Sequence, residues 1–237
     1  SAARAAQGHI GRARALARNE EARNRRAWIL SLPTELRTLG DCLEAARRLD
    51  EDADAEVGAA TAELDARERA KLERALGLDT KGARARNAQA AIRDLESEQK
   101  ARTKRMRRDA LDRVLTELTT FYRDVLAVQT AAVPVEDEAA LSGPRLVNAE
   151  FSRQIHQMAD SSSPAQTVHR IDAILDTRKS LESNVAPLLA VETMLIAISG
   201  VDEKLRGRVA RPSSAGPAHG WRAHPHRSAP HRSAGPQ

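Results

Sequence analysis

Aromatic residues and cysteines are scarce in this 237-residue sequence, and it has no long uninterrupted apolar segment. Aromatics make up 2% of the chain, and the single cysteine, Cys42, has no second cysteine with which to form an internal disulfide. The longest apolar run, residues 185–201, is interrupted by Pro187, Glu192 and Thr193, so it is too short and too broken to span a bilayer. These absences exclude disulfide-framework, collagen-like and membrane-spanning proteins.

Strand signals are missing as well, because nowhere does a short run of β-branched or aromatic residues alternate with polar ones. Glycine is infrequent, while alanine, leucine, arginine and glutamate are abundant, a composition typical of helices. The first residues also lack the apolar stretch of a secretory signal peptide. The sequence therefore predicts an all-α protein, and we expect it to be cytoplasmic with no membrane partner.

Positive charge is concentrated at the end of the chain. The formal net charge is +5, and residues 206–237 hold six arginines and no acid, so subtracting them leaves −1 for residues 1–205. The same segment holds five of the ten prolines and four of the seven histidines. It has too few apolar residues to fold, so we predict a disordered, low-complexity tail at 201–237. Two interpretations remain: a tether for nucleic acid or metal, or an unselected out-of-frame extension, which the composition favours.

Apolar spacing predicts helices along the first half of the chain. Residues 20–31 follow a helical pattern that we expect to end before Pro33, because the residue before a proline disfavours helical dihedrals. Thr34 is then predicted to cap a second helix that continues through Leu49. Residues 50–77 are helical by propensity but carry few large apolar residues.

One long helical pattern covers residues 85–128. Its first half is polar on all sides, and an apolar stripe thickens only from Leu111 to Val125. A helix of this kind is expected to project from the body before it joins the core.

Three further helices are predicted near the C-terminus. An amphipathic pattern covers residues 145–159, and Ser163–Gln166 then places serine as cap, proline first and glutamine third, a strong start signal. The last helix is expected to begin at Pro187 and to stop at Gly200. Because the last two helices are apolar over more than one narrow stripe, we expect them to need neighbours on two sides.

Catalytic and cofactor motifs are missing from the sequence. The glycine pair nearest to a phosphate loop, Gly77 and Gly82, has its lysine before the second glycine and no strand leading in. HExxH and CxxC patterns do not occur, and the histidines of the body stand singly, so no metal site is predicted. Cys42 is expected to be a buried, inert thiol. We therefore predict that the chain is not an enzyme by itself.

The densest charge lies at residues 100–108, where six of nine residues are basic. It predicts contact with the backbone of a nucleic acid, without sequence-specific reading because no aromatic residue interrupts it to stack on a base. The alternative is a solvated helix whose arginines pair with neighbouring acids of the same segment, namely Asp94, Glu96, Glu98 and Asp109. The candidate contact residues are Lys100, Arg102, Lys104, Arg105, Arg107 and Arg108.

Several runs resemble a known family. The runs FYRDVL at residues 121–126 and NVAPLLAVETML at residues 184–195 resemble the C-terminal domain of the delta-prime subunit of bacterial DNA polymerase III. The stretch from Leu95 to Arg113 resembles the actinobacterial form, and QGHIGRA at residues 7–13 resembles the end of the small helical lid of clamp-loader AAA+ proteins. The resemblance covers residues 1–200 and keeps the same order along the chain.

This resemblance implies a collar that assembles with sister subunits. Residues 1–18 would be a remnant of the lid, and residues 19–200 a helical oligomerisation domain that packs against gamma/tau and delta subunits in a hetero-pentamer. The sliding clamp and primer-template DNA would be reached through that complex. The DNA polymerase activity of the whole assembly would then belong to another subunit.

The resemblance also bears on nucleotide binding. Arg12 falls where the family has its sensor-2 arginine, which meets nucleotide phosphates in ATP-binding relatives. Since delta-prime subunits are generally regarded as non-hydrolysing, we favour a surface arginine or a salt bridge between lid and body. The nucleotide-binding half and the family's Ser-Arg-Cys motif are missing here, so a C-terminal fragment without ATP or another cofactor is expected. The alternatives are a free-standing nucleic-acid-binding protein and, last, a coiled-coil scaffold on residues 85–128.

Overall fold

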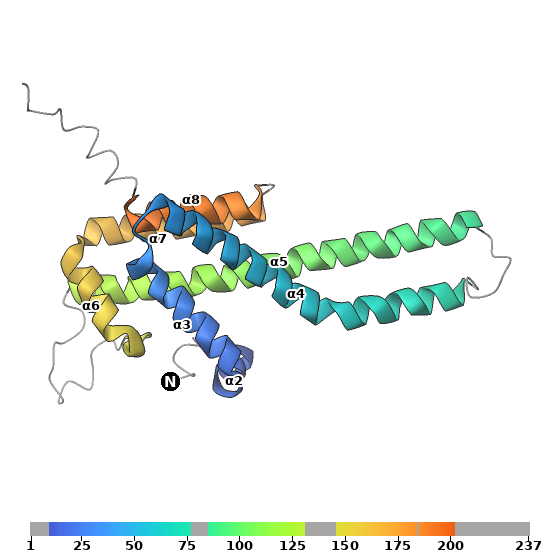
Figure 1. Cartoon of the computed structure of the whole chain (residues 1–237), viewed down its shortest axis with the longest axis horizontal. Coiled ribbons are helices and arrows are strands. Elements are labelled where there is room, and N and C mark those ends of the chain that lie inside the picture. Colours follow the sequence, from blue (N-terminus) through green and yellow to red (C-terminus); the bar gives the residue numbers. More distant parts are fainter. Residues whose placement is uncertain (1–9, 77–84, 131–145, 184, 202–237) are drawn as a thin grey trace, which may run out of the picture.

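The computed structural model describes residues 10–76, 85–130, 146–183 and 185–201, and every regular element in these ranges is a helix (Figure 1). The predicted all-α fold is confirmed. Residues 1–9 of the expected lid remnant and residues 202–237 of the expected tail lie outside the described ranges. The elements are α2 (Ile10–Arg18), α3 (Glu20–Glu35), α4 (Leu39–Ala75), α5 (Ala85–Gln129), the 3-10 helix η1 (Ala149–Phe151), α6 (Ser152–Ser161), α7 (Pro164–Glu182) and α8 (Pro187–Ser199).

Two of these helices extend well beyond the others (Figure 1). α4 and α5 run antiparallel, and the main apolar core follows them only as far as Ala53 and Ala110. We call the parts beyond these positions, residues 54–76 and 85–109, the arm, and the remaining described residues the body. The predicted projection of the long helix is confirmed, since its polar half lies in the arm and its apolar half in the body.

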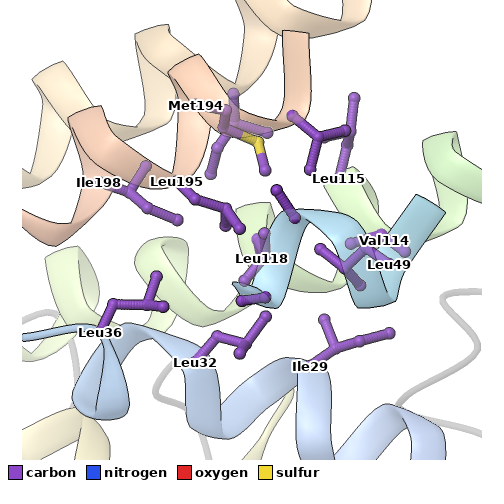
Figure 2. Close-up of a cluster of buried hydrophobic side chains, with 14 of the residues drawn as sticks. Ile29, Leu32, Leu36, Leu49, Val114, Leu115, Leu118, Met194, Leu195 and Ile198 are labelled. Carbon is purple, nitrogen blue, oxygen red and sulfur yellow. The ribbon is translucent and has the colours of Figure 1, made fainter. Parts of the chain in front are cut away.

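The core of the body is one cluster to which α3, α4, α5 and α8 contribute most (Figure 2). Leu118, Phe121 and Tyr122 of α5 are fully buried at its centre. The two rings meet edge to face at 5.5 Å, and the Tyr122 hydroxyl donates a hydrogen bond to the Ile198 carbonyl. Burying one such apolar side chain contributes about 1.5–3 kcal/mol, so this cluster supplies most of the stability of the body.

The first helix boundary differs from the prediction. α3 does not stop before Pro33 but runs to Glu35, with Pro33 buried in its last turn. Because proline has no N–H, one hydrogen bond of the last turn is lost, but the helix continues and the buried ring adds to its apolar face. The Leu36 N–H still donates to the Leu32 carbonyl and closes the last turn.

The predicted cap of the second helix is also wrong. The Thr34 hydroxyl lies inside α3, where it donates to the Ser31 carbonyl. α4 is capped instead by Thr38, whose side chain accepts from the Asp41 N–H, while the Asp41 carboxylate accepts from the Thr38 N–H at 2.8 Å. This reciprocal pair is a capping box. Because the backbone N–H groups of Arg37 and Thr38 donate to that carboxylate, the pKa of Asp41 is lowered.

Three boundaries near the C-terminus are confirmed, among them the start of α8 at Pro187, and one is not. Ser163 and Gln166 form the expected capping box at the start of α7. Gly200 ends α8 in the left-handed region, at a φ of 67° that residues with a side chain rarely adopt. α6, predicted from residue 145, begins only at Ser152, because residues 147–151 form a turn and the 3-10 helix.

α8 has neighbours on two sides, as its sequence requires, but both belong to this chain. It packs against α4 and α7, and five of its side chains are buried between them. Less apolar surface is therefore left for a partner than the sequence suggested. Within the described ranges, no helix has both the length and the apolar content needed to cross a membrane.

Candidate functional site

The basic stretch of residues 100–108 lies on α5, in the part of the arm that adjoins the body. Its six cations do not act alike, because two of them bind across the arm to α4. Arg102 Nη2 lies 2.6 Å from Asp65 Oδ1 and also bonds to the Glu68 carboxylate. Arg107 Nη2 lies 2.6 Å from Asp50 Oδ1, and its Nε lies 2.8 Å from Asp54 Oδ1.

These ion pairs correct the predicted partners. The sequence suggested that the arginines pair along their own helix, with Asp94, Glu96, Glu98 and Asp109. The carboxylates that bind Arg102 and Arg107 all come from α4 instead. Glu96 is held by Arg69 of α4, with Nη2 and Oε1 3.2 Å apart. Charge pairs between α4 and α5 thus fasten the arm, in addition to the pairs Arg67–Glu63 and Arg69–Glu73 along α4.

The electrostatics of the arm follow from these contacts. Hydrogen bonds from the Arg102 guanidinium, and after it from Gln99, hold the pKa of the Glu68 carboxyl below its ordinary value. Hydrogen bonds to Glu68 and, after it, to Asp65 raise the pKa of Arg102. Gln99 also donates to the Asp65 carbonyl at 3.2 Å, so a neutral hydrogen bond lies beside the charged ones. Both helices of the arm are therefore joined at this level by several polar contacts.

The other four cations remain available. Lys100, Lys104 and Arg105 are exposed and Arg108 is half-buried, and none of them has a carboxylate within ion-pair distance among the described residues. They are the members of the predicted nucleic-acid contact set whose charge is not neutralised. The structure therefore divides that set into two structural arginines and four free cations.

Three of these cations face an open groove of about 620 Å³ at the base of the arm. Lys100, Lys104 and Arg108 line it from α5. Residues 183 and 185–187 form the opposite side, where Val185 is exposed and Pro187 half-buried, and Asp54 and Asp65 of α4 also line the groove. Arg105 does not line the groove. The arrangement can hold an anionic group beside an apolar one.

Arg12, the predicted sensor-2-like residue, lies in α2. Its side chain is outside the described part of the structure, so its role stays a prediction.

A buried polar network in the body was not predicted from the sequence. Arg26 of α3 is 8% exposed, and its Nε donates to Glu117 of α5 at 3.1 Å. The same guanidinium binds the Glu150 carboxylate and the Asn148 side-chain oxygen. Burial acts to raise the pKa of Glu150, but hydrogen bonds from its own backbone and from Arg26 hold it below its ordinary value. Arg26 thus joins α3, α5 and η1.

Asp124 holds the other side of this network. It is fully buried, and its carboxylate accepts from the Val147 N–H at 3.1 Å and from the Asn148 N–H at 2.8 Å. The Asn148 side chain donates back to Asp124 and to the Thr120 hydroxyl. The sequence offered one signal for this buried polar network: Asp124 stands inside the otherwise mainly apolar run FYRDVL, and a buried carboxylate needs hydrogen-bond partners.

The remaining reactive side chains show no site. Cys42 is buried, its Sγ lies 3.7 Å from the Leu195 carbonyl, and burial raises the pKa of its thiol. His156 and His169 are exposed, and His156 Nδ1 lies 2.8 Å from the Ser152 carbonyl. Among the described residues, no cluster of three or more histidine, cysteine or acidic side chains could hold a metal ion.

Part of the outer surface is apolar. Val168 and Leu175 are seven residues apart and therefore lie on the same face of α7, and they are 44% and 38% exposed. On α4, Leu39 and Leu43 are exposed one turn apart. Leu189 of α8, 57% exposed, is turned away from the core that its neighbours on the helix join.

Comparison with protein-family models, with curated proteins and with solved structures found no match for this chain.

Proposed function

We propose that this chain is a non-catalytic assembly module of the clamp-loader type, the C-terminal part of a delta-prime-like subunit. The proposal starts from the sequence resemblance and is supported by the all-helical body. In this role the chain binds gamma/tau and delta-like subunits in a hetero-pentamer and contributes to loading the sliding clamp on primer-template DNA. Arg12 would stand in the remnant of the lid, and ATP would be bound by other subunits.

The observation that carries the proposal is the outer face of α7. Its inner face is buried through Ile174 and Leu181, yet Val168 and Leu175 on the outside remain exposed. Covering this exposed apolar pair with a partner is favourable, because it removes apolar surface from water. Sister collars would supply that cover, and a specific interface of this kind buries about 1,200–2,000 Å².

Co-elution with the sister subunits tests the proposal. The full chain is mixed with gamma/tau and delta subunits and followed by size-exclusion chromatography. We expect a complex that V168D and L175D each weaken, because a carboxylate in a desolvated interface loses its hydration. H169D, which places the same charge on an exposed neighbour in α7, should leave the complex intact. A helical chain, verified by circular dichroism, that fails to associate with these subunits would contradict the proposal.

We rank the free-standing nucleic-acid-binding alternative second. The four free cations of α5 favour it, because lysine and arginine release counterions when they bind phosphates. Against it stand Arg102 and Arg107, whose charges are already neutralised by carboxylates of α4. Tight, salt-dependent binding of duplex DNA by the chain without any other subunit would reverse the ranking.

A further inference from the structure

The groove at the base of the arm has an uneven distribution of charge. Three carboxylates line it, and each already has an arginine partner: Asp54 binds Arg107, Asp65 binds Arg102 and Glu96 binds Arg69. The lining cations Lys100, Lys104 and Arg108 have no carboxylate partner in the described part of the chain. The lining therefore holds four cations against three carboxylates, and the three cations without a carboxylate partner are the charges that an occupant can bind.

The three free cations also follow a regular spacing. Lys100, Lys104 and Arg108 are four residues apart, so they form a row along one side of α5. The rise of an α-helix sets neighbouring members about 6 Å apart and the whole row at about 12 Å. Alternate residues of an extended peptide are separated by about 6.6 Å, so acidic side chains on one side of such a peptide match this row.

The opposite edge of the groove is apolar. Val185 is 40% exposed, and Ala186 and Pro187 continue the same edge. Leu181, which is buried, lies beneath them as part of the lining. An occupant that satisfies both edges must carry negative charge on one side and an apolar group on the other.

We propose that this groove is a docking site for an acidic segment of a partner protein, with alternate carboxylates on the α5 cations and an apolar side chain against Val185. This inference does not depend on the assembly proposed above, because it uses none of the residues on the outer face of α7. A peptide fits better than a nucleic acid for two reasons. A row of phosphates has no apolar group to cover Val185, and none of the described residues that line the groove is an aromatic that could stack on a base.

Fluorescence anisotropy with the full chain tests the site. The probe is a fluorescein-labelled peptide of about twelve residues that carries glutamate at alternate positions and one leucine among the intervening residues. We expect saturable binding at low ionic strength that the triple variant K100A/K104A/R108A weakens by at least about tenfold, since each substitution removes one charge from the row. V185S should weaken it by a smaller factor, because it removes only the apolar contact.

The matched control is R105A, which removes an exposed cation of the same helix outside the groove. It should leave peptide binding within about twofold of the parent chain, because its charge is not in the row. A probe with glutamine in place of every glutamate should not bind. Circular dichroism of each variant establishes that α5 remains helical.

Three outcomes would overturn the inference. The first is a folded chain that does not bind the acidic probe. The second is an equal loss in R105A and in the triple variant, which means diffuse attraction without a site. The third is tighter binding of a DNA duplex than of the peptide with the same loss in the triple variant, which assigns the groove to nucleic acid.

Discussion

In the body, α5 meets its neighbours through Leu118, Phe121 and Val125, all fully buried, whereas in the arm the same helix meets α4 through Gln99, Arg102 and Arg107. The buried hydrophobic residues of the arm that the structure describes are Val57 and Ala88, both small. Apolar contacts are insensitive to salt and acid, while partly exposed ion pairs are weakened by both. The comparison teaches that one continuous helix can join a firmly packed region to one that responds to its solution conditions.

The largest effect is expected from the centre of the body. F121A removes a fully buried ring from the core and should lower the free energy of unfolding by about 3–5 kcal/mol through lost burial and the cavity it leaves. L95A in the arm, where the side chain is half-buried, should cost much less. Chemical denaturation followed by circular dichroism measures both. Equal losses would mean that the arm and the body do not differ as described.

The second largest effect is expected in the buried polar network around Arg26 in the body. R26M leaves the Glu117 carboxylate, whose side chain is 8% exposed, without the guanidinium that binds it, and should cost about 3 kcal/mol or more. R25M, which removes an exposed pair with Glu56, should cost less than about 1 kcal/mol. The same denaturation assay compares the two variants. If R26M proves as mild as R25M, the network does not stabilise the body.

A smaller effect is expected where α4 begins. T38A removes the hydroxyl that accepts the Asp41 N–H and should cost about 1 kcal/mol. Because α4 belongs to both the body and the arm, the amide hydrogen exchange rates along this helix show how far the destabilisation by T38A extends. We expect faster exchange in the first turns of α4 and unchanged exchange beyond residue 54, since the core contacts at Leu49 and Ala53 lie between them.

The smallest effect is a response to acid that is expected first in the arm. The body also holds acids with lowered pKa values, Asp41 and Glu150, but its apolar core does not titrate. The folded pKa of Glu68 is lowered from its ordinary value of 4.5, so its stabilising contribution is present in full above that value and is lost as the pH falls through the folded pKa. Amide exchange, corrected for its intrinsic pH dependence, should therefore accelerate in the arm below about pH 4 before it does in the body. R102Q should abolish this difference, because it removes the charge that lowers the pKa. Simultaneous loosening of both regions would contradict the comparison.

Local chemistry in the sequence located several boundaries correctly. The start of α7 depends on Ser163, Pro164 and Gln166, and the end of α8 on Gly200, so both are visible without tertiary information. The thickening apolar stripe likewise separated the arm from the body. The predicted end of α3 before Pro33 was wrong, because burial of the proline ring at the end of this helix outweighs the usual effect of proline on the residue before it.

The partners of charged side chains could not be predicted in the same way. A one-dimensional pattern offers only acids that are three or four residues away, but Arg102 binds Asp65, 37 residues earlier, and Arg26 binds Asn148, 122 residues later. The groove is hidden for the same reason, since its two edges come from α5 and from the connection between α7 and α8. The sequence alone located the basic residues at 100–108. Only the fold shows which of them are paired with carboxylates of α4 and which are not.

α5 is a single helix of 45 residues that contains neither proline nor glycine. At about 1.5 Å per residue it is a rod of roughly 65–70 Å with no built-in hinge. Because α5 has no proline or glycine at which to bend, we expect a force on the far end of the arm to be transmitted along the helix to the buried rings of Phe121 and Tyr122. Mechanical load on the slender end is in this way converted into strain at the centre of the molecule.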